Sequence, residues 1–363
     1  MTTLKIKFIL GQISQPRCLK RLEAIKNAGF EIAVYGFDNG LYNENIRNKD
    51  YKIHSIRIDG KGNKFVKSIK KILFIKKVCS ISSSHDILYA FGIDIAFWVY
   101  LFTGGRRKYI YEEADLNYTK FSNKYIVRFF KSVDKYLIRH SYYAVLTSDG
   151  FVEYLYAFSI PPKQIIVLPN KLNVYFRNVS RNFYELQNVE KIRFGFIGAV
   201  RYPNTIVRFA EVVGKYFPQY EFTFWGTGIG INEALIRCET YNNVKFEGAF
   251  RNPEDLETIY SNIDINIVCY DTTYFNVTIA EPNKLYESIF FGKPMVVSAN
   301  TFLATKVKEW GIGFAANCST DIYIKEFISS LGVEQINRCI KNCAKIQKEE
   351  LIDSTTILIE KIV

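Results

Sequence analysis

The chain has 363 residues, enough for about two domains, and its 48% apolar and 23% charged residues exclude an intrinsically disordered protein. No apolar run approaches the ~20 residues that a transmembrane helix needs, and Met1–Lys7 leads into a strand-like run without a signal-peptide pattern. Seven scattered cysteines and three histidines show no metal-ligand spacing, so we expect no metal site, no histidine-based nucleophile and reduced cytosolic thiols.

Apolar runs and helix signals alternate along the first half of the chain. Such alternation predicts parallel strands joined by right-handed crossovers. The expected strands are 4–10, 31–37, 51–58, 87–91, 109–111, 143–147 and 165–168, and the expected helices are 16–28, 61–78, 95–102, 120–140 and 150–157.

A second alternating series follows a polar stretch. Its expected strands are 192–197, 220–225, 244–246, 263–269 and 295–297, and its expected helices are 205–217, 231–238, 253–262, 282–291, 305–310 and several over 320–363. Two such series predict an α/β protein of two Rossmann-like, doubly wound domains that face each other across a cleft. We place the domains at 1–175 and 191–345, with a linker at 176–190. A C-terminal helix, 346–363, is a candidate for crossing back to the N-terminal domain.

The charge is distributed unevenly between these halves. Residues 1–175 hold 28 Lys and Arg against 14 Asp and Glu, whereas residues 176–363 hold 20 against 22. A basic half indicates an anionic partner surface, either a membrane or nucleic acid.

Two basic amphipathic helices are expected in the basic half, over 61–78 and 120–140. The first has seven lysines and no acid, and the second has Asp134 as its only acid. Cations and large apolar residues on one helix are typical of a membrane surface, but they also suit a helix that packs its apolar face on a sheet. No RNA-binding module is evident, which makes nucleic acid the weaker reading. Candidates for facing the membrane are Lys67, Lys70, Lys71, Phe74 and Lys131.

The stretch Ala280–Ser298 reads as a loop, a short helix, a glycine stop at Gly292 and a buried strand. Lys284 falls in the first helical turn, and Glu287 lies three residues later on the same face. A cation and a carboxylate at a helix N-terminus can hold a phosphate and a hydroxylated sugar. They can equally form a solvated i,i+3 ion pair on an ordinary helix.

Several stretches together resemble the GT-B glycosyltransferases, in particular the large retaining family-4-like group. The resemblance runs through nearly the whole chain, and each motif is short, so their order and spacing carry it. The matching stretches are 15–21 with 28–32, Pro169-Asn170, Phe196–Arg201, Asn243–Gly248, Leu256 with Tyr260 and Asp264, and Pro282–Glu287 with Gly292-Lys293-Pro294.

The resemblance implies a hexosyltransferase of surface-polysaccharide assembly that uses a nucleotide-sugar donor, expected to be UDP-linked, with no other cofactor. Glu287 would bind the donor ribose. Lys284 and Arg201 would neutralise the diphosphate without a metal, and Gly198 would let the diphosphate approach the backbone closely. These three charged residues are the expected catalytic set, in a retaining reaction without an obligatory protein nucleophile. The remaining expected donor-site residues are Glu281, Asn283 and Leu285.

The acceptor is expected to bind the N-terminal domain. The candidates there are Gly11, Arg17, Glu113 and Asp115, and the acceptor would be a saccharide or a lipid-linked saccharide. The enzyme would then work in the cytoplasm, and the inner face of the membrane is a candidate location.

One of the chain's departures from the family pattern concerns the contacts to the sugar. Many relatives have a glutamate eight residues before the position of Glu287, where this chain has Ile279. The contacts to the sugar are therefore less defined than those to the nucleotide. Two alternatives stay open: a nucleotide-sugar epimerase on the same scaffold, and a non-catalytic or nucleic-acid-binding protein.

Overall fold

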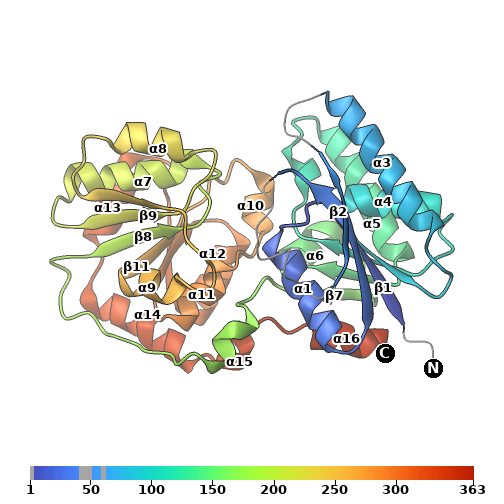
Figure 1. The fold of residues 1–363 in the computed structure, drawn as a ribbon. Helices are drawn as coiled ribbons and strands as arrows, with labels where there is room; N and C mark the ends of the chain where they lie inside the picture. The colour runs from blue at the N-terminus through green and yellow to red at the C-terminus, as the bar shows by residue number, and fades with distance from the viewer. Residues whose placement is uncertain (1–3, 41–50, 59–62) are drawn as a thin grey trace. The chain divides into compact units, whose positions relative to one another are not determined.

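The computed structural model describes residues 4–40, 51–58 and 63–363. The chain forms two compact α/β units (Figure 1), the first made of Met1–Pro169 with Ser354–Val363 and the second of Asn170–Asp353. Each is a doubly wound parallel sheet, so the predicted fold class is confirmed. Within the described residues, no helix is both long enough and apolar enough to cross a membrane.

In the described residues, the first unit holds a seven-stranded sheet in the order β3-β2-β1-β4-β5-β6-β7, with neighbouring strands parallel. Its strands are β1 (Lys5–Leu10), β2 (Glu31–Asp38), β3 (Ile53–Arg57), β4 (Ile87–Phe91), β5 (Tyr109–Glu113), β6 (Tyr143–Leu146) and β7 (Ile165–Val167). Its helices are α1 (Pro16–Asn27), α3 (Lys64–Ser80), α4 (Ile93–Phe102), η1 (Asn117–Lys120), α5 (Lys124–His140), α6 (Asp149–Tyr156) and α16 (Thr356–Ile362).

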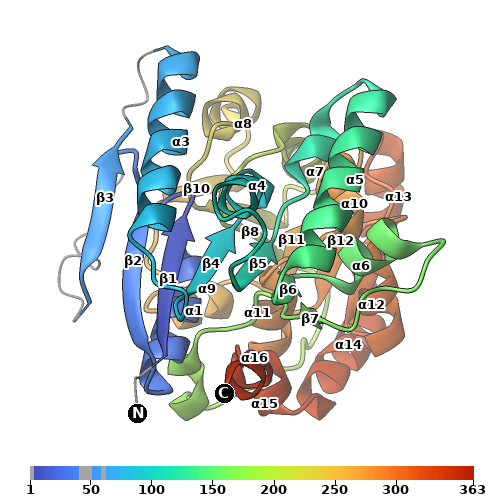
Figure 2. The same cartoon turned by 90° about the vertical axis from the view of Figure 1, so that its right-hand side faces the viewer.

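Helices cover both faces of this sheet, as a parallel sheet requires (Figure 1). Alternate residues of β1, namely Ile6, Phe8 and Leu10, share a core with α1 and α16. Helices α3, α4 and α5 lie on the opposite face (Figure 2). Helix α3 begins at Lys64 after the N-cap Asn63, and positions 61 and 62 of the predicted basic helix lie outside the described residues.

The second unit holds, in its described residues, a six-stranded parallel sheet in the order β10-β9-β8-β11-β12-β13. Its strands are β8 (Arg193–Ile197), β9 (Glu221–Trp225), β10 (Val244–Gly248), β11 (Ile265–Val268), β12 (Met295–Ser298) and β13 (Gly313–Ala316). Its helices are η2 (Val174–Asn178), α7 (Pro203–Tyr216), α8 (Ile231–Cys238), α9 (Leu256–Ser261), α10 (Phe275–Ile279), α11 (Lys284–Phe290), α12 (Phe302–Trp310), α13 (Asp321–Ser329), α14 (Val333–Lys345) and α15 (Lys348–Leu351).

Two apolar cores sandwich the second sheet. One joins α7, α8 and α13 to alternate residues of β8 and β9, and the other joins α9, α11 and α12 to β12 and the remaining side of β8. All neighbouring strands of this sheet are parallel. Their carboxyl ends therefore lie at one edge of the sheet. By the general rule for open α/β sheets, a ligand binds at that edge.

The segment predicted as a linker, 176–190, packs on the second unit instead, and the boundary lies at Pro169–Asn170. Phe176 is buried, with its ring 5.0 Å from the ring of Phe290. The Arg181 guanidinium donates to the carbonyl oxygens of Ile289, Phe290, Cys343 and Ile346 at 2.6–3.3 Å. Because this stretch is mostly polar, its composition did not indicate the few residues that anchor it to the core.

The expected C-terminal helix, 346–363, is two short helices separated by extended residues. Ile352 forms a parallel bridge with Leu172, and the Asp353 amide donates to the Leu172 carbonyl at 2.8 Å. These backbone bonds compete with helix formation at 352–353. Helix α15 therefore belongs to the second unit and α16 to the first.

Strand β13 was not expected from the sequence, because its Gly-Phe-Ala-Ala composition is poor in the β-branched residues typical of strands. It pairs with β12 in the sheet, with Gly313 opposite Met295. A Cβ on Gly313 would lie 2.2 Å from the Met295 carbonyl oxygen, so the close approach requires glycine.

Candidate active site

The predicted donor residues of the second unit gather where β8, β9 and β11 end and α11 begins. Gly198 follows β8 with φ +126°, and Gly226 and Gly228 follow β9 with φ +130° and +135°. A Cβ on Gly226 would lie 2.2 Å from the Gly198 carbonyl oxygen, and one on Gly228 would lie 2.7 Å from the Val200 backbone. The two loops thus pack backbone to backbone and leave peptide groups at the sheet edge.

Lys284 places a buried ammonium group against these loops. The residue is 7% exposed, and its Nζ donates to the Tyr270 hydroxyl at 2.9 Å. A Cβ on Gly198 would lie 2.9 Å from the same Nζ, which also stands 5.0 Å from the centre of the Phe196 ring. Within the described part of the chain, no acidic side chain forms an ion pair with Lys284. A buried cation that contacts only neutral groups would be stabilised by binding an anion.

Glu287 is buried and accepts several hydrogen bonds within α11 and from nearby segments. Its carboxylate accepts from the Asn283 amide at 2.7 Å, the Tyr260 hydroxyl at 3.0 Å and the Asn252 amide at 3.4 Å. Burial, followed by the charge of Glu287, raises the pKa of Tyr260 well above its usual value. The i,i+3 ion pair to Lys284 that we considered is not formed, because the two side chains bind different segments.

Two other predicted donor residues have structural roles. The Glu281 carboxylate is fully buried and is bound by Lys306 and by the Tyr286 hydroxyl, so its charge is already compensated. It is not the helix N-cap, which is Asn283. The Leu285 side chain is fully buried in the core. Its contacts are therefore with apolar residues and not with a ligand.

Arg201 extends from the loop after β8 and is exposed. No hydrogen bond or ion pair of Arg201 is found within the described residues. The neighbouring Tyr202 ring lies 4.5 Å from that of Tyr274. Arg201 is therefore available to an anion that reaches this loop.

Sequence reasoning missed two residues of this site. Tyr270 contacts Lys284, and Lys306 contacts Glu281. Tyr270 immediately follows the apolar strand β11, and the rule that ligands meet strand carboxyl ends could have identified it. Lys306 lies 25 residues from Glu281 on another helix, and no local pattern connects the two.

Three of the four acceptor-side candidates in the first unit, Arg17, Glu113 and Asp115, lie at or beside the end of β5. Arg17 is partly buried, with its Nε 3.4 Å from the buried Glu112 carboxylate, which Arg21 and Tyr89 also contact. Glu112 was not predicted. Gly11 is exposed in the loop after β1.

Glu113 is a buried structural carboxyl and not an open acceptor ligand. Its oxygens accept from the backbone amides of Ile93, Ala114 and Asp115 at 2.9–3.1 Å and from the Tyr111 hydroxyl at 2.9 Å. Burial, followed by the charge of Asp134, raises the pKa of Glu113 above its usual value. Asp115, at the same turn, is half-buried and stays the better acceptor-side candidate.

The candidates for facing a membrane divide into two groups. Lys70 is exposed, and Lys67 is half-buried. Phe74 instead lies 5.6 Å from the Phe37 ring, Lys71 stands over that ring, and Lys131 donates to the Tyr154 carbonyl at 2.6 Å. The positions of Phe74, Lys71 and Lys131 on their helices direct these side chains toward the sheet or toward α6.

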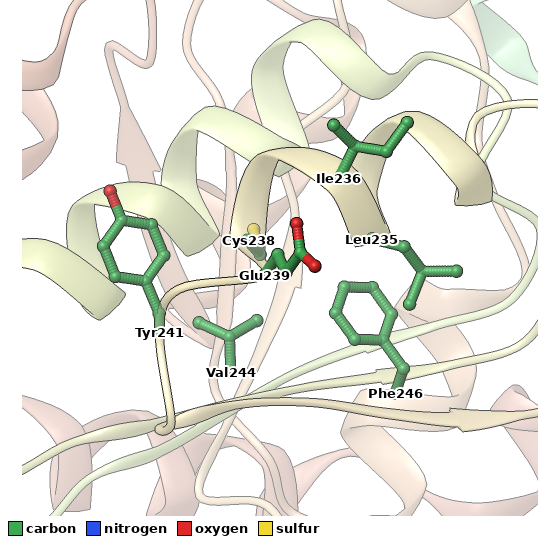
Figure 3. Close-up of a pocket in the computed structure, with 7 residues that line it drawn as sticks. All are labelled: Leu235, Ile236, Cys238, Glu239, Tyr241, Val244 and Phe246. Atoms are coloured by element: carbon green, nitrogen blue, oxygen red, sulfur yellow. The ribbon is translucent and has the colours of Figure 1, made fainter.

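A pocket of about 360 Å³ lies elsewhere in the second unit, between α8 and the edge strand β10 (Figure 3). Its lining is mainly apolar and includes Leu235, Ile236, Tyr241, Val244 and Phe246. None of the predicted site residues lines it.

Comparison with solved structures identifies the fold. The Anabaena protein HepE, solved with UDP, superposes with a TM-score of 0.69 over 99% of this chain and 98% of its own, at 12% identity. The chain has the GT-B fold. A further structure of HepE holds UDP-glucose. A Listeria monocytogenes protein described as a candidate UDP-N-acetylglucosamine 2-epimerase has a similar fold, with a TM-score of 0.63 over 94% of this chain and 91% of its own, at 13% identity.

Sequence comparison finds a likeness that covers part of the chain. The succinoglycan biosynthesis protein ExoL of Rhizobium meliloti is 23% identical in an alignment of 225 residues that covers 58% of this chain. The match spans about half of that relative, 55% of its length. No protein-family model matches the chain.

Proposed function

We propose that the chain is a glycosyltransferase that moves a sugar from a UDP-linked donor to a saccharide or lipid-linked saccharide in polysaccharide synthesis. The observation that carries this proposal is the buried Lys284 ammonium, which has no acidic partner among the described residues and adjoins the glycine loops after β8 and β9. The UDP complexes of HepE and the likeness to ExoL support the choice of donor and process.

In this proposal the second unit stabilises the departing nucleoside diphosphate. Negative charge develops on the diphosphate as the glycosidic bond breaks, and preorganised cations lower the energy of that state. Lys284 and Arg201 supply the positive charge, so we propose a metal-independent reaction. The Glu287 carboxylate, held by Asn283 and Tyr260, binds the ribose hydroxyls. We further propose retention of anomeric configuration, with no protein nucleophile assigned.

The cysteines support a cytoplasmic site of action. All seven are free and buried, which suits a reducing compartment where disulfides do not form.

An epimerase is the second candidate, because the Listeria protein described as a candidate epimerase shares the fold. The two reactions differ in their products. A transferase releases UDP and forms a new glycoside, whereas an epimerase returns an isomerised nucleotide sugar. Product analysis after incubation with UDP-sugars and an acceptor panel separates them, and binding of RNA or duplex DNA without UDP-sugar binding would favour the non-catalytic alternative.

The site assignment is tested with Lys284→Met, which keeps the side-chain volume and removes the charge. Replacing a buried charge by an apolar group is often neutral or stabilising, so we expect an unchanged or higher Tm. The UDP dissociation constant, measured by calorimetry, should rise at least about tenfold, which corresponds to ~1.4 kcal/mol. Donor turnover should fall in Lys284→Met and also in Glu287→Gln.

The matched control is Lys325→Met, at an exposed lysine on α13 of the same unit. It should leave the UDP affinity and turnover unchanged. Wild-type affinity and turnover in both Lys284→Met and Glu287→Gln would refute the assignment.

A further inference from the structure

Helices α3, α4 and α5 form one continuous layer on the first unit (Figure 2). Helix α4 packs between the other two, and the hydroxyls of Tyr100 on α4 and Tyr136 on α5 are 2.7 Å apart. The layer therefore presents a single outer surface and not three separate helices.

This outer surface carries large apolar side chains at helical spacing. Phe65 on α3 is 71% exposed, and Phe129 on α5 is 63% exposed. The exposed apolar residues recur at intervals of three or four, which places them along one side of each helix. They are Phe65, Val66, Ile69 and Leu73 on α3, Phe97 and Leu101 on α4, and Tyr125, Ile126, Phe129 and Tyr136 on α5.

Packing on the sheet does not account for these residues, because other side chains already do it. Helix α3 buries Ile75, Val78 and Cys79, and α5 buries Leu137 and Ile138. The buried residues lie in the second halves of both helices, whereas most of the exposed apolar residues lie in the first halves. A helix needs only one apolar face to pack on a sheet, so packing does not explain the second, exposed apolar face of these helices.

Cations flank the exposed apolar residues. Asp134, the one acid of α5, is fully buried, and α3 has no acid. The solvent side of these two helices is therefore basic, with Asp94 on α4 an exposed exception. The exposed cations are Lys64, Lys70, Lys76 and Lys77 on α3 and Lys124, Arg128 and Arg139 on α5.

We propose that this surface, defined by the exposed apolar residues and cations above, docks on an anionic lipid bilayer. Aromatic and aliphatic side chains would enter the interface, and the lysines would reach the lipid phosphates. Protein interfaces are depleted in lysine, which disfavours a protein partner. A second copy would bring the same positive surface and be repelled. Nucleic acid would match the cations but leave the apolar side chains without a function.

The docking surface lies toward one edge of the unit. Crossover helices run opposite to the parallel strands, so the first turns of α3 and α5 lie at the carboxyl ends of the strands. The loops that carry Gly11 and Asp115 follow β1 and β5 at that same edge. If the proposed function holds, a lipid-linked acceptor would then be presented to these loops directly from the bilayer.

The test is co-sedimentation of the full chain with vesicles. Vesicles of equal parts phosphatidylglycerol and phosphatidylcholine should bind the protein at low salt, and pure phosphatidylcholine vesicles should bind it at least tenfold less. Binding should weaken in 0.5 M NaCl because salt screens exposed charges. The double variants Phe65→Ser with Phe129→Ser and Lys70→Gln with Lys124→Gln should each reduce binding about tenfold or more.

Ile236→Ser is the matched control, because Ile236 is 73% exposed but lies on α8 of the second unit. It should bind vesicles like the wild type. Equal loss of binding in this control, no preference for anionic vesicles, or a dimer that the double variants dissociate would overturn the proposal. UDP affinity is measured in parallel and should be unchanged in all variants, so that failure of docking is distinguished from failure of the donor site.

Discussion

At the scale of single residues, two buried carboxyls of the first unit share one tyrosine. The Tyr111 hydroxyl lies 2.9 Å from Glu113 and 2.8 Å from Asp134, and Tyr118 donates to Asp134 at 2.9 Å. A hydroxyl has one proton to donate, so two short contacts to carboxyl oxygens require a second proton on one of the carboxyls. Burial raises the pKa of both groups and favours this shared protonation.

This arrangement predicts that the first unit loses stability as pH rises. Burial, followed by the charge of Asp134, raises the pKa of Glu113 from 4.5 to about 8. A group that binds its proton more tightly when folded contributes stability that is fully present below pH ~4.5 and is lost as pH approaches ~8. In Asp134→Asn the free energy of unfolding should fall less steeply over that window, as measured by urea unfolding at several pH values.

Glu153→Gln is the control, because Glu153 is an exposed acid on α6 of the same unit. It should retain the wild-type pH dependence. An identical slope in wild type and Asp134→Asn would contradict the shared-proton account.

At the scale of elements, Arg181 joins the C-terminal ends of two helices. Its guanidinium donates to carbonyls at the end of α11, including Ile289 at 3.1 Å, and to carbonyls at the end of α14, including Cys343 at 2.7 Å. Helix ends leave such carbonyls without helical partners, and a cation there also complements the helix dipole. One side chain outside both helices thus fixes their relative position.

We therefore predict that Arg181→Ala destabilises the second unit by about 2–3 kcal/mol, the order expected when charge-assisted hydrogen bonds to buried groups are lost. Arg181→Lys should rescue only part of the loss, because an ammonium cannot reproduce the planar fork of donors. Urea unfolding measures both. Arg177→Ala, at an exposed arginine of η2, should change stability by less than about 0.5 kcal/mol, and an equal effect at the two positions would argue against the role of Arg181.

At the scale of the whole molecule, the chain end completes the first unit although it follows the second in sequence. Leu358 and Ile362 of α16 are buried in the core that contains β1 and α1, and Arg21 donates to the Thr355 hydroxyl at 2.8 Å. The first unit therefore cannot assemble its full core until residues 354–363 have been synthesised.

Leu358→Ala should destabilise the first unit by about 2–5 kcal/mol through the cavity it leaves. Ile357 is its neighbour on the same helix and is 52% exposed, so Ile357→Ala should cost far less. Trp98 is the only tryptophan of the first unit, and its fluorescence in a Trp225→Phe, Trp310→Phe background reports that unit alone. An unchanged Trp98 transition in Leu358→Ala would show that α16 is dispensable.

The sequence by itself determined the elements and their order. Apolar periodicity and Gly and Pro signals suffice to place most strands and to locate the helix after Pro282 with its stop at Gly292, whose φ is +64°. These features depend on backbone geometry and on neighbours a few residues away, which a local pattern records. The same pattern put Lys284 and Glu287 on one helix.

Only the tertiary structure decided what those side chains contact. Lys284 meets Tyr270 and Phe196, and Glu287 meets Tyr260, whereas the predicted donor ligand Glu281 is neutralised by Lys306. Likewise, Phe74 packs on the sheet while Phe65 on the same basic helix faces solvent. Such contacts join segments far apart in sequence, and they arise because packing a core fixes which face of each helix is buried and which charges meet there.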